Sequence, residues 1–565
     1  MFESKYDTKA KTYDPILPAP KEWPVVRLGK NRKEFVEEVV NASFSKILQL
    51  RGSTELLKEE LEITMFKERL RVKENPWKVD PEDESLFWSN VKKNLLHLSS
   101  DNEADVERET HDILKEIISR YANEIAGNFK PSHYSMARTI VTFGFGRLFN
   151  AAKLGSFKGL FKGKLTLQDK IHIEGETEQL RNLAKIGTIV MVPTHFSNLD
   201  SITIGFVIHS LGLPPFIYGA GLNLFNIALF AYFMNSLGAY KVDRRKKNMI
   251  YLETLKMYSD LALQNGIHSL FFPGGTRSRS GKLESHLKLG LLSTAMDAQR
   301  LNYLKANGGK ADKIFIVPVV LNYNFVLEAV HLISDYLEKK GQERYYTESD
   351  QFSSSYKILS FLTKFFTRGA DMSVSIGAAM DLFGNSVDAS GNSLDKSGNI
   401  IDIKDYFTSN DIITENVQRD GEYTRMLGEK IVTDFYRNAQ CSPSHLAAFV
   451  GFELIRKKNT KLDLYSLFRI PTEDLEIEYD EFARIYAKLR DIVIEYEVLG
   501  KIKVNQALRV NNLEMLIRSG VNSVGTFHAQ RPLLFNKEGN IITNDLKTLY
   551  YYRNRLDGYG FEKYI

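Results

Sequence analysis

The stretch Gly187-Thr-Ile-Val-Met-Val-Pro-Thr-His-Phe-Ser-Asn-Leu-Asp200 decides how the chain folds. Its first six residues are mostly apolar or β-branched, and they predict a buried strand over 187–192. A polar loop follows, and apolar residues resume as a helix after Asp200. A strand that runs into a polar loop and then a helix is typical of an α/β domain, in which sites lie at the carboxyl ends of strands.

Three further runs predict strands of the same domain, over residues 267–272, 314–321 and 372–376. We therefore divide the chain into an extended, proline-containing leader over 1–31, a helical region over 32–126, the α/β domain over 127–410 and a mostly helical region over 411–565. In the second region, apolar residues between Val106 and Ile125 recur at spacings of three, four and seven, which predicts an amphipathic helix.

Two stretches rich in turn formers predict surface hairpins, over residues 383–400 and near residues 536–539. A calcium loop over the first stretch would need closer acidic spacing than Asp388 and Asp395 provide.

Composition limits the classes of function. The chain has 565 residues, enough for two or three units, and is 43% hydrophobic and 26% charged, as expected of a folded globular protein. A net charge of +5 is too mild to indicate a nucleic-acid binder, and no known reading module accompanies the basic segments.

The number of cysteines and the length of the apolar runs limit the kinds of site and the cellular compartment that fit this chain. Cys441 is the single cysteine, so an intramolecular disulfide and a multi-cysteine zinc site are excluded, and a reducing cytoplasm fits best. We predict no metal and no cofactor. The first residues lack a signal-peptide pattern and no window of about 18 apolar residues occurs. Any membrane contact is therefore expected to be peripheral or shallow.

His195 and Asp200 form the first element that could carry chemistry. A histidine at the end of a strand, with an aspartate five positions later in the first helical turn, can act as a base and the acid that orients it. The same spacing also fits a hydrogen-bonded capping pair without catalytic function.

Two basic loops follow. The first is Gly238-Ala-Tyr-Lys-Val-Asp-Arg-Arg245, and it also fits a solvated basic turn. The second, Gly274-Gly-Thr-Arg-Ser-Arg-Ser-Gly-Lys282, comes after the strand predicted over 267–272. Adjacent glycines let backbone approach a ligand closely, and the basic side chains can donate to the oxygens of a phosphate monoester. An ordinary basic loop has a similar composition.

These elements, followed by Val317-Pro318 on a strand, have the order of the four motif blocks of the glycerolipid acyltransferases. The chain resembles the branch that acylates glycerol 3-phosphate and dihydroxyacetone phosphate, because Gly275 to Lys282 is followed by Gly290-Leu-Leu292. The resemblance covers about residues 130–410, with a fainter likeness at Tyr551-Tyr-Arg-Asn-Arg-Leu556. It implies a mixed-sheet acyltransferase domain between the two helical regions.

Two positions depart from the pattern of that branch. Phe196 stands where an arginine usually follows the histidine of the first block, and we consider Lys241 or Arg245 as a replacement for the lost charge. Gly274 stands where the third block usually has a glutamate. Plastid-type glycerol-3-phosphate acyltransferases look similar in lacking that glutamate, so its absence does not indicate an inactive protein.

The resemblance implies transfer of a fatty acyl group from acyl-CoA or acyl carrier protein to the sn-1 hydroxyl of glycerol 3-phosphate. His195 is expected to act as general base and Asp200 to orient it, without a covalent acyl-enzyme. The acceptor is expected to contact residues of the second, third and fourth blocks, namely Arg244, Gly275, Thr276, Arg277, Ser278, Arg279, Lys282 and Pro318.

Two segments favour contact with the cytoplasmic face of a membrane. Residues 125–168 contain no acidic residue but several lysines, arginines and phenylalanines, a pattern typical of helices that lie among anionic headgroups. Residues 201–240 contain no Lys, Arg, Asp or Glu. Their most apolar part, 222–237, fits an acyl-chain groove, a shallow insertion into the membrane or a buried core helix.

Rival functions remain open. Lysophosphatidate, dihydroxyacetone phosphate or an amino-acid lipid headgroup could replace glycerol 3-phosphate, because the first three blocks would serve each of them. A noncatalytic peripheral lipid-binding protein is the alternative of another class, and the departures at Phe196 and Gly274 motivate it. The presence of both His195 and Asp200 argues against that alternative.

Overall fold

A computed structural model describes residues 13–77, 79–98, 102–139, 171–222, 238–341 and 372–565. These residues contain a seven-stranded sheet with the order β1-β7-β6-β2-β5-β3-β4. The fold is a mixed α/β domain with helical regions on either side in the sequence, as predicted. Its strands are β1 (Ile171–Gly175), β2 (Gly187–Pro193), β3 (Ile217–Gly221), β4 (Ala239–Val242), β5 (Ser269–Leu270), β6 (Lys313–Tyr323) and β7 (Met372–Ile376).

Strands β6, β2, β5, β3 and β4 run parallel to one another, and β7 is antiparallel to β6. β2 and β6 are apolar and buried along nearly their whole length, as central strands covered on both faces must be. The carboxyl ends of parallel strands meet at one edge of a sheet. The loops after β2 and β5, which carry the first and third motif blocks, therefore leave the sheet side by side, while the fourth block lies within β6.

The four predicted strands are present with different lengths. β2, β6 and β7 match their predictions closely, whereas only Ser269 and Leu270 of the 267–272 run form a strand. The run is shortened because the Ile267 amide donates to the Ala262 carbonyl and closes the end of the preceding helix. The sequence reading missed β1, β3 and β4, and β3 reads Ile-Tyr-Gly-Ala-Gly, whose glycines weaken a strand pattern.

Both predicted hairpins are confirmed. β8 (Ser386–Val387), β9 (Ser393–Leu394) and β10 (Ile400–Ile401) pair in antiparallel order within the first stretch. β16 (Leu534–Phe535) pairs with β17 (Ile541–Ile542), and β17 also pairs with β14 (Glu476–Ile477). Two further short pairs join β11 (Thr408–Ser409) to β12 (Ile412–Ile413), and β13 (Gln440–Cys441) to β15 (Lys503–Val504).

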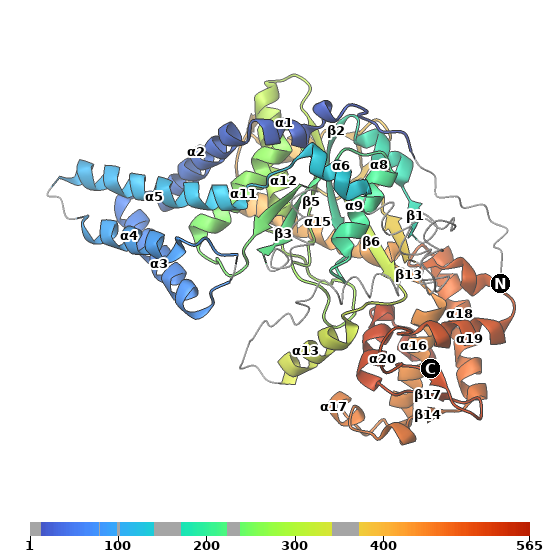
Figure 1. Cartoon of the computed structure of the whole chain (residues 1–565). Coiled ribbons are helices and arrows are strands. Elements are labelled where there is room, and N and C mark those ends of the chain that lie inside the picture. The colour runs from blue at the N-terminus through green and yellow to red at the C-terminus, as the bar shows by residue number, and fades with distance from the viewer. Residues whose placement is uncertain (1–12, 78, 99–101, 140–170, 223–237, 342–371) are drawn as a thin grey trace.

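Helices surround the sheet and extend from it in two directions (Figure 1). The N-terminal group is α1 (Pro24–Lys30), α2 (Arg32–Arg51), α3 (Thr54–Glu74), α4 (Glu84–Leu96), α5 (Glu103–Ile125) and α6 (Pro131–Thr139). The helices between strands are α8 (Thr177–Leu183), α9 (Asp200–Ser210), α11 (Met249–Gln264), α12 (Leu292–Ala306) and α13 (Ala329–Gly341). The C-terminal group is α15 (Val417–Asn438), α16 (Pro443–Lys458), α17 (Leu464–Leu467), α18 (Tyr479–Val498), α19 (Leu513–Ser523) and α20 (Leu546–Arg553).

The helical regions dock on the sheet domain through particular helices. α2 and α5 pack against α11, and α20 packs against α13. α15 packs against α12 and β6, although it lies in the C-terminal part of the sequence. Figure 1 shows α3, α4 and much of α5 projecting on one side, with α16 to α20 gathered on another.

The prediction of an extended leader over 1–31 is wrong for its last part. Residues 24–30 form α1, because Pro24 occupies the first helical position and two valines bury their side chains. Most of the basic segment 125–168 and most of the apolar segment 222–237 lie outside the described residues. None of the helices that the structure describes is both long enough and apolar enough to cross a membrane.

Candidate active site

His195 and Asp200 are in contact at the carboxyl end of β2. The Nδ1 atom of His195 lies 2.7 Å from Oδ2 of Asp200, which is the first residue of α9 and is fully buried. The same oxygen accepts hydrogen bonds from the backbone amides of Phe196 (2.6 Å) and Ser197 (3.0 Å). Asp200 therefore holds both the ring of His195 and the loop that carries it.

The imidazole of His195 is mostly buried, but part of it is accessible to solvent. Its side chain is 12% exposed, and its ring stacks on Phe272 with centroids 4.1 Å apart. Burial lowers the pKa of His195 below its usual value, against the effect of Asp200, and the positive charges of Arg277 and Arg244 lower it further. The ring is therefore neutral near pH 7. Because Nδ1 faces Asp200, Nε2 is the nitrogen that can accept a proton.

Tyr323, the last residue of β6, supports Asp200 from the opposite side. Its hydroxyl donates a hydrogen bond to Oδ1 of Asp200. Burial and the negative charge of Asp200 raise the pKa of Tyr323 well above its usual value, so the hydroxyl keeps its proton and remains a donor. The sequence reading did not identify Tyr323, because an apolar strand gives no sign that its last residue points at a carboxylate.

The Gly274–Lys282 loop lies directly against His195. The Ser278 amide donates to the His195 carbonyl (2.7 Å), and Gly275 has a φ of 76°, in the left-handed region that favours glycine. Arg277 forms an ion pair with Glu328 at 3.3 Å. Glu328 also accepts hydrogen bonds from the Ser197 hydroxyl and the Asn198 amide, both at 3.0 Å. The loop of the first block and the guanidinium of the third block are thus tied together by one carboxylate.

The remaining predicted site residues have different surroundings. Thr276 is exposed and Arg279 is half-buried. The Lys282 ammonium forms an ion pair with Asp557 at 2.8 Å, so it binds the C-terminal region in this structure. Pro318 is buried in β6 and pairs in register with Val192 of β2. Pro318 therefore lies in the core under the site.

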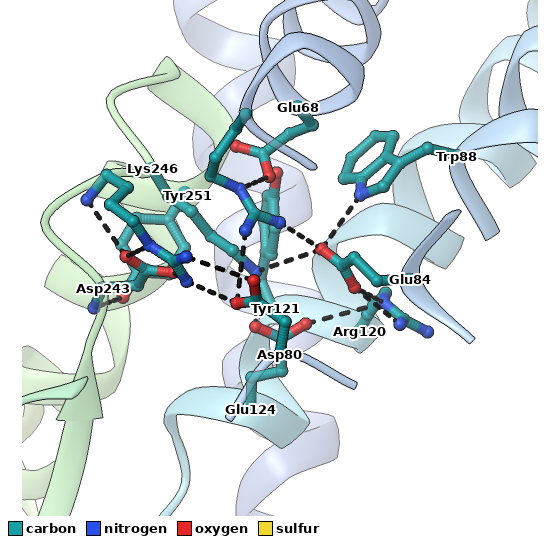
Figure 2. Close-up of polar contacts among 12 residues, drawn as sticks. Glu68, Asp80, Glu84, Trp88, Arg120, Tyr121, Glu124, Asp243, Lys246 and Tyr251 are labelled. Atoms are coloured by element: carbon teal, nitrogen blue, oxygen red, sulfur yellow. Dashed lines mark hydrogen bonds and ion pairs between the residues drawn. The ribbon is translucent and has the colours of Figure 1, made fainter. Parts of the chain in front are cut away.

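The second basic loop is anchored by the N-terminal helices (Figure 2). Arg245 forms ion pairs with Asp80 and Asp243, and its guanidinium lies 4.0 Å from the centre of the Trp77 ring. With its charge neutralised in this way, Arg245 does not replace the arginine missing at position 196. Arg244, its neighbour, is close enough to His195 to affect its pKa.

Lys246 continues this anchoring inside the protein. It is 2% exposed and pairs with Glu124 of α5 and with Glu84 of α4, the latter at 3.7 Å. Glu84 also pairs with Arg71 of α3 and Arg120 of α5 (Figure 2). Removing one member of a buried ion-pair network leaves an uncompensated charge, which costs about 3–5 kcal/mol. The N-terminal helices thus hold the loop that carries Arg244.

The C-terminal region closes the site from the other side. The Asn554 side chain donates to the Ser280 carbonyl at 2.9 Å. A Cβ on Gly281 would lie 2.2 Å from the Tyr551 carbonyl oxygen, so the loop and the C-terminal chain are in close backbone contact. Arg555 is buried, and its guanidinium stacks 3.4 Å from the centre of the Phe196 ring. The faint likeness noted at residues 551–556 was the sequence signal for this contact.

Residues 174–322, which contain this site, match the family model described as Acyltransferase. The chain carries an acyltransferase domain. The matched range begins within β1, ends within β6 and contains all four motif blocks.

Curated relatives match over a wider range. A glycerol-3-phosphate acyltransferase of Shewanella sp. (strain MR-7) is 26% identical over 280 residues, which is 49% of this chain and 31% of that protein. One from Pseudomonas aeruginosa (strain UCBPP-PA14) is 26% identical over 235 residues, which is 41% of this chain and 25% of that protein. The chain thus spans less than a third of the length of each of these relatives.

Next to the site, the acyltransferase domain has a narrow apolar pocket. It is lined by one face of α9, including Ser201, Ile204 and Ile208, and by residues of β3, β5 and α6. Ser201, which belongs to this lining, immediately follows Asp200 in α9.

Proposed function

We propose that this protein transfers a fatty acyl group from acyl-CoA or acyl carrier protein to the sn-1 hydroxyl of glycerol 3-phosphate. The observation that carries the proposal is a neutral imidazole, His195, held by Asp200 beside a loop that bears Arg277. An anion bound by that loop would present a hydroxyl to a base. The names of the relatives, glycerol-3-phosphate acyltransferase, favour this acceptor.

In the proposed reaction, Nε2 of His195 takes the proton of the acceptor hydroxyl as its oxygen attacks the thioester carbonyl carbon. The tetrahedral intermediate collapses with cleavage of the C–S bond, and the imidazolium returns the proton to the departing thiolate. Asp200 keeps Nδ1 protonated and stabilises the transient imidazolium. Products are the acyl ester and the free thiol, and the enzyme regains its starting protonation state.

The acceptor phosphate is proposed to bind to Arg277 and Arg244, whose charges already act on His195. Glu328 competes for Arg277 until the phosphate arrives, and it keeps that guanidinium in place. Arg279, Thr276 and Ser278 belong to the same loop. We place the protein at the cytoplasmic face of a membrane, as a peripheral protein, on the strength of the basic and uncharged segments of the sequence.

The test is a thiol-release assay with the purified protein. Palmitoyl-CoA and palmitoyl carrier protein are each paired with glycerol 3-phosphate, lysophosphatidate and dihydroxyacetone phosphate. We expect glycerol 3-phosphate to give the highest kcat/KM. His195→Ala should lower kcat by at least about 100-fold, the usual contribution of a general base, whereas Arg277→Ala should mainly raise the KM for the acceptor.

Two results would change the assignment. A higher kcat/KM with another acceptor would keep the acyltransferase chemistry and replace the substrate. No thiol release with any pair, together with binding of lipid vesicles, would instead support the noncatalytic lipid-binding alternative.

A further inference from the structure

The two positions that depart from the motif pattern are each covered by a charged side chain from elsewhere in the chain. Gly274 has no side chain, and the carboxylate of Glu284 occupies the space beside it. A Cβ built on Gly274 would lie 2.9 Å from Cγ and 3.1 Å from Oε1 of Glu284. Gly274 does not have a positive φ, so Glu284 is what blocks a side chain there.

Glu284 holds the backbone of His195. Its Oε1 atom accepts a hydrogen bond from the His195 amide at 2.8 Å, and its Oε2 atom is buried without a hydrogen-bond partner. The His195 carbonyl accepts from the Ser278 amide. The backbone amide and the backbone carbonyl of His195 are therefore both hydrogen-bonded to the segment 278–284. Burial raises the pKa of Glu284 to about 7, against the hydrogen bond from His195 and the positive charge of Arg555.

Arg555 covers the second position. Phe196 is completely buried, and Cζ of the Arg555 guanidinium lies over its ring, 3.4 Å from the centroid, which is a cation–π contact. Arg555 is itself 6% exposed, and its Nη2 has no hydrogen-bond partner. A buried guanidinium is costly unless charges compensate it, and the carboxylates of Asp200 and Glu284 are its acidic neighbours.

We propose that Glu284 and Arg555 are positioning residues that supply, from outside the motif blocks, the carboxylate and the guanidinium that positions 274 and 196 lack. Together they hold the His195–Phe196 peptide so that Nε2 of His195 faces the acceptor. The inference rests on the proposed function, because it concerns the same site.

The first experiment moves the carboxylate back to position 274. Four proteins are compared: wild type, Glu284→Ala, Gly274→Glu and the double variant Gly274→Glu/Glu284→Ala. At pH 8, above the pKa of about 7 that places Glu284 in its ionised form, losing a hydrogen bond to a charged acceptor should lower kcat of Glu284→Ala about 10- to 100-fold, with little change in the KM of the acyl donor. Gly274→Glu alone should be as impaired, because its side chain meets Glu284. The double variant should recover to within about threefold of wild type.

The second experiment moves the guanidinium in the same way, with Arg555→Ala, Phe196→Arg and the double variant. We expect each single variant to lose at least about tenfold in kcat, and the double variant to recover most of that loss. Ser285→Ala is the control for both experiments, since Ser285 follows Glu284 directly but is exposed, and this variant should behave as wild type.

Melting temperatures of all variants are measured beside kcat. The inference would be overturned by double variants whose relative kcat is no higher than the product of the relative kcat values of their single variants, and whose loss of melting temperature is no smaller than the sum of the losses of those variants. The proposed function fails by a different result, namely absence of acyl transfer to glycerol 3-phosphate by the wild type. In that case the recovery of the double variants is measured with the acceptor that the wild type does use, or by melting temperature alone. The same comparison of double with single variants then tests the positioning role of Glu284 and Arg555.

Discussion

Replacing Tyr323 by phenylalanine tests how the dyad is tuned. In the wild type, Oδ1 of Asp200 accepts from the Tyr323 hydroxyl while Oδ2 accepts from His195 and two backbone amides. A phenyl ring preserves the packing of β6 but removes that donor. Without that donor, the negative charge of Asp200 stabilises the imidazolium form of His195 more strongly. The pKa of His195 should therefore rise.

The expected changes in the free energy of unfolding and in the pKa of His195 follow from the contacts. A hydrogen bond to a charged group contributes about 1.5–3 kcal/mol, so the free energy of unfolding should fall by about that amount. About half of the lost interaction should reappear as stronger attraction between Asp200 and the imidazolium. That amount corresponds to a rise of about 0.5–1 unit in the pKa of His195, at 1.36 kcal/mol per unit.

The assay is the pH dependence of kcat/KM, whose acid limb reports the base of the free enzyme. The wild-type limb should lie below the ordinary histidine range, because burial lowers the pKa of His195. In Tyr323→Phe the limb should move to higher pH, so activity falls most at acid pH. Tyr240→Phe is the matched control, since the Tyr240 hydroxyl is buried without a hydrogen-bond partner. A limb that stays in place or moves to lower pH in Tyr323→Phe would refute this account of the dyad.

Three further variants test other parts of the structure. Arg245→Ala should lower the free energy of unfolding by about 3–5 kcal/mol, because buried Asp243 loses its ion-pair partner and Asp80 is left with Arg71. Exposed Lys247→Ala should change that free energy by less than about 0.5 kcal/mol in the same urea titration. Cys441→Ser should keep its turnover, because burial raises the pKa of the thiol and leaves no thiolate nucleophile; loss of turnover with a normal circular dichroism spectrum would contradict direct transfer. Glu328→Gln should alter the acceptor KM more than kcat, since Glu328 places Arg277, and a fall in kcat alone would argue against that role.

The sequence was sufficient to predict the class of the domain, its central strands and the contact between His195 and Asp200 in the loop after β2. The central strands could be predicted because strands buried on both faces are continuous apolar runs, as in 187–192 and 314–321. The dyad could be predicted because His195 and Asp200 are five residues apart and belong to one strand-loop-helix unit. Local spacing carries such information directly.

The partners of those residues were decided by the tertiary structure. Arg245 was a candidate for the missing charge, yet Asp80, 165 residues earlier, neutralises it. Tyr323, Glu328 and Arg555 lie 123 to 359 residues later in the chain than the residues of the 196–200 segment that they contact. Whether a charge is paired, buried or free to bind substrate depends on what packs against it, and no spacing along the chain records that packing.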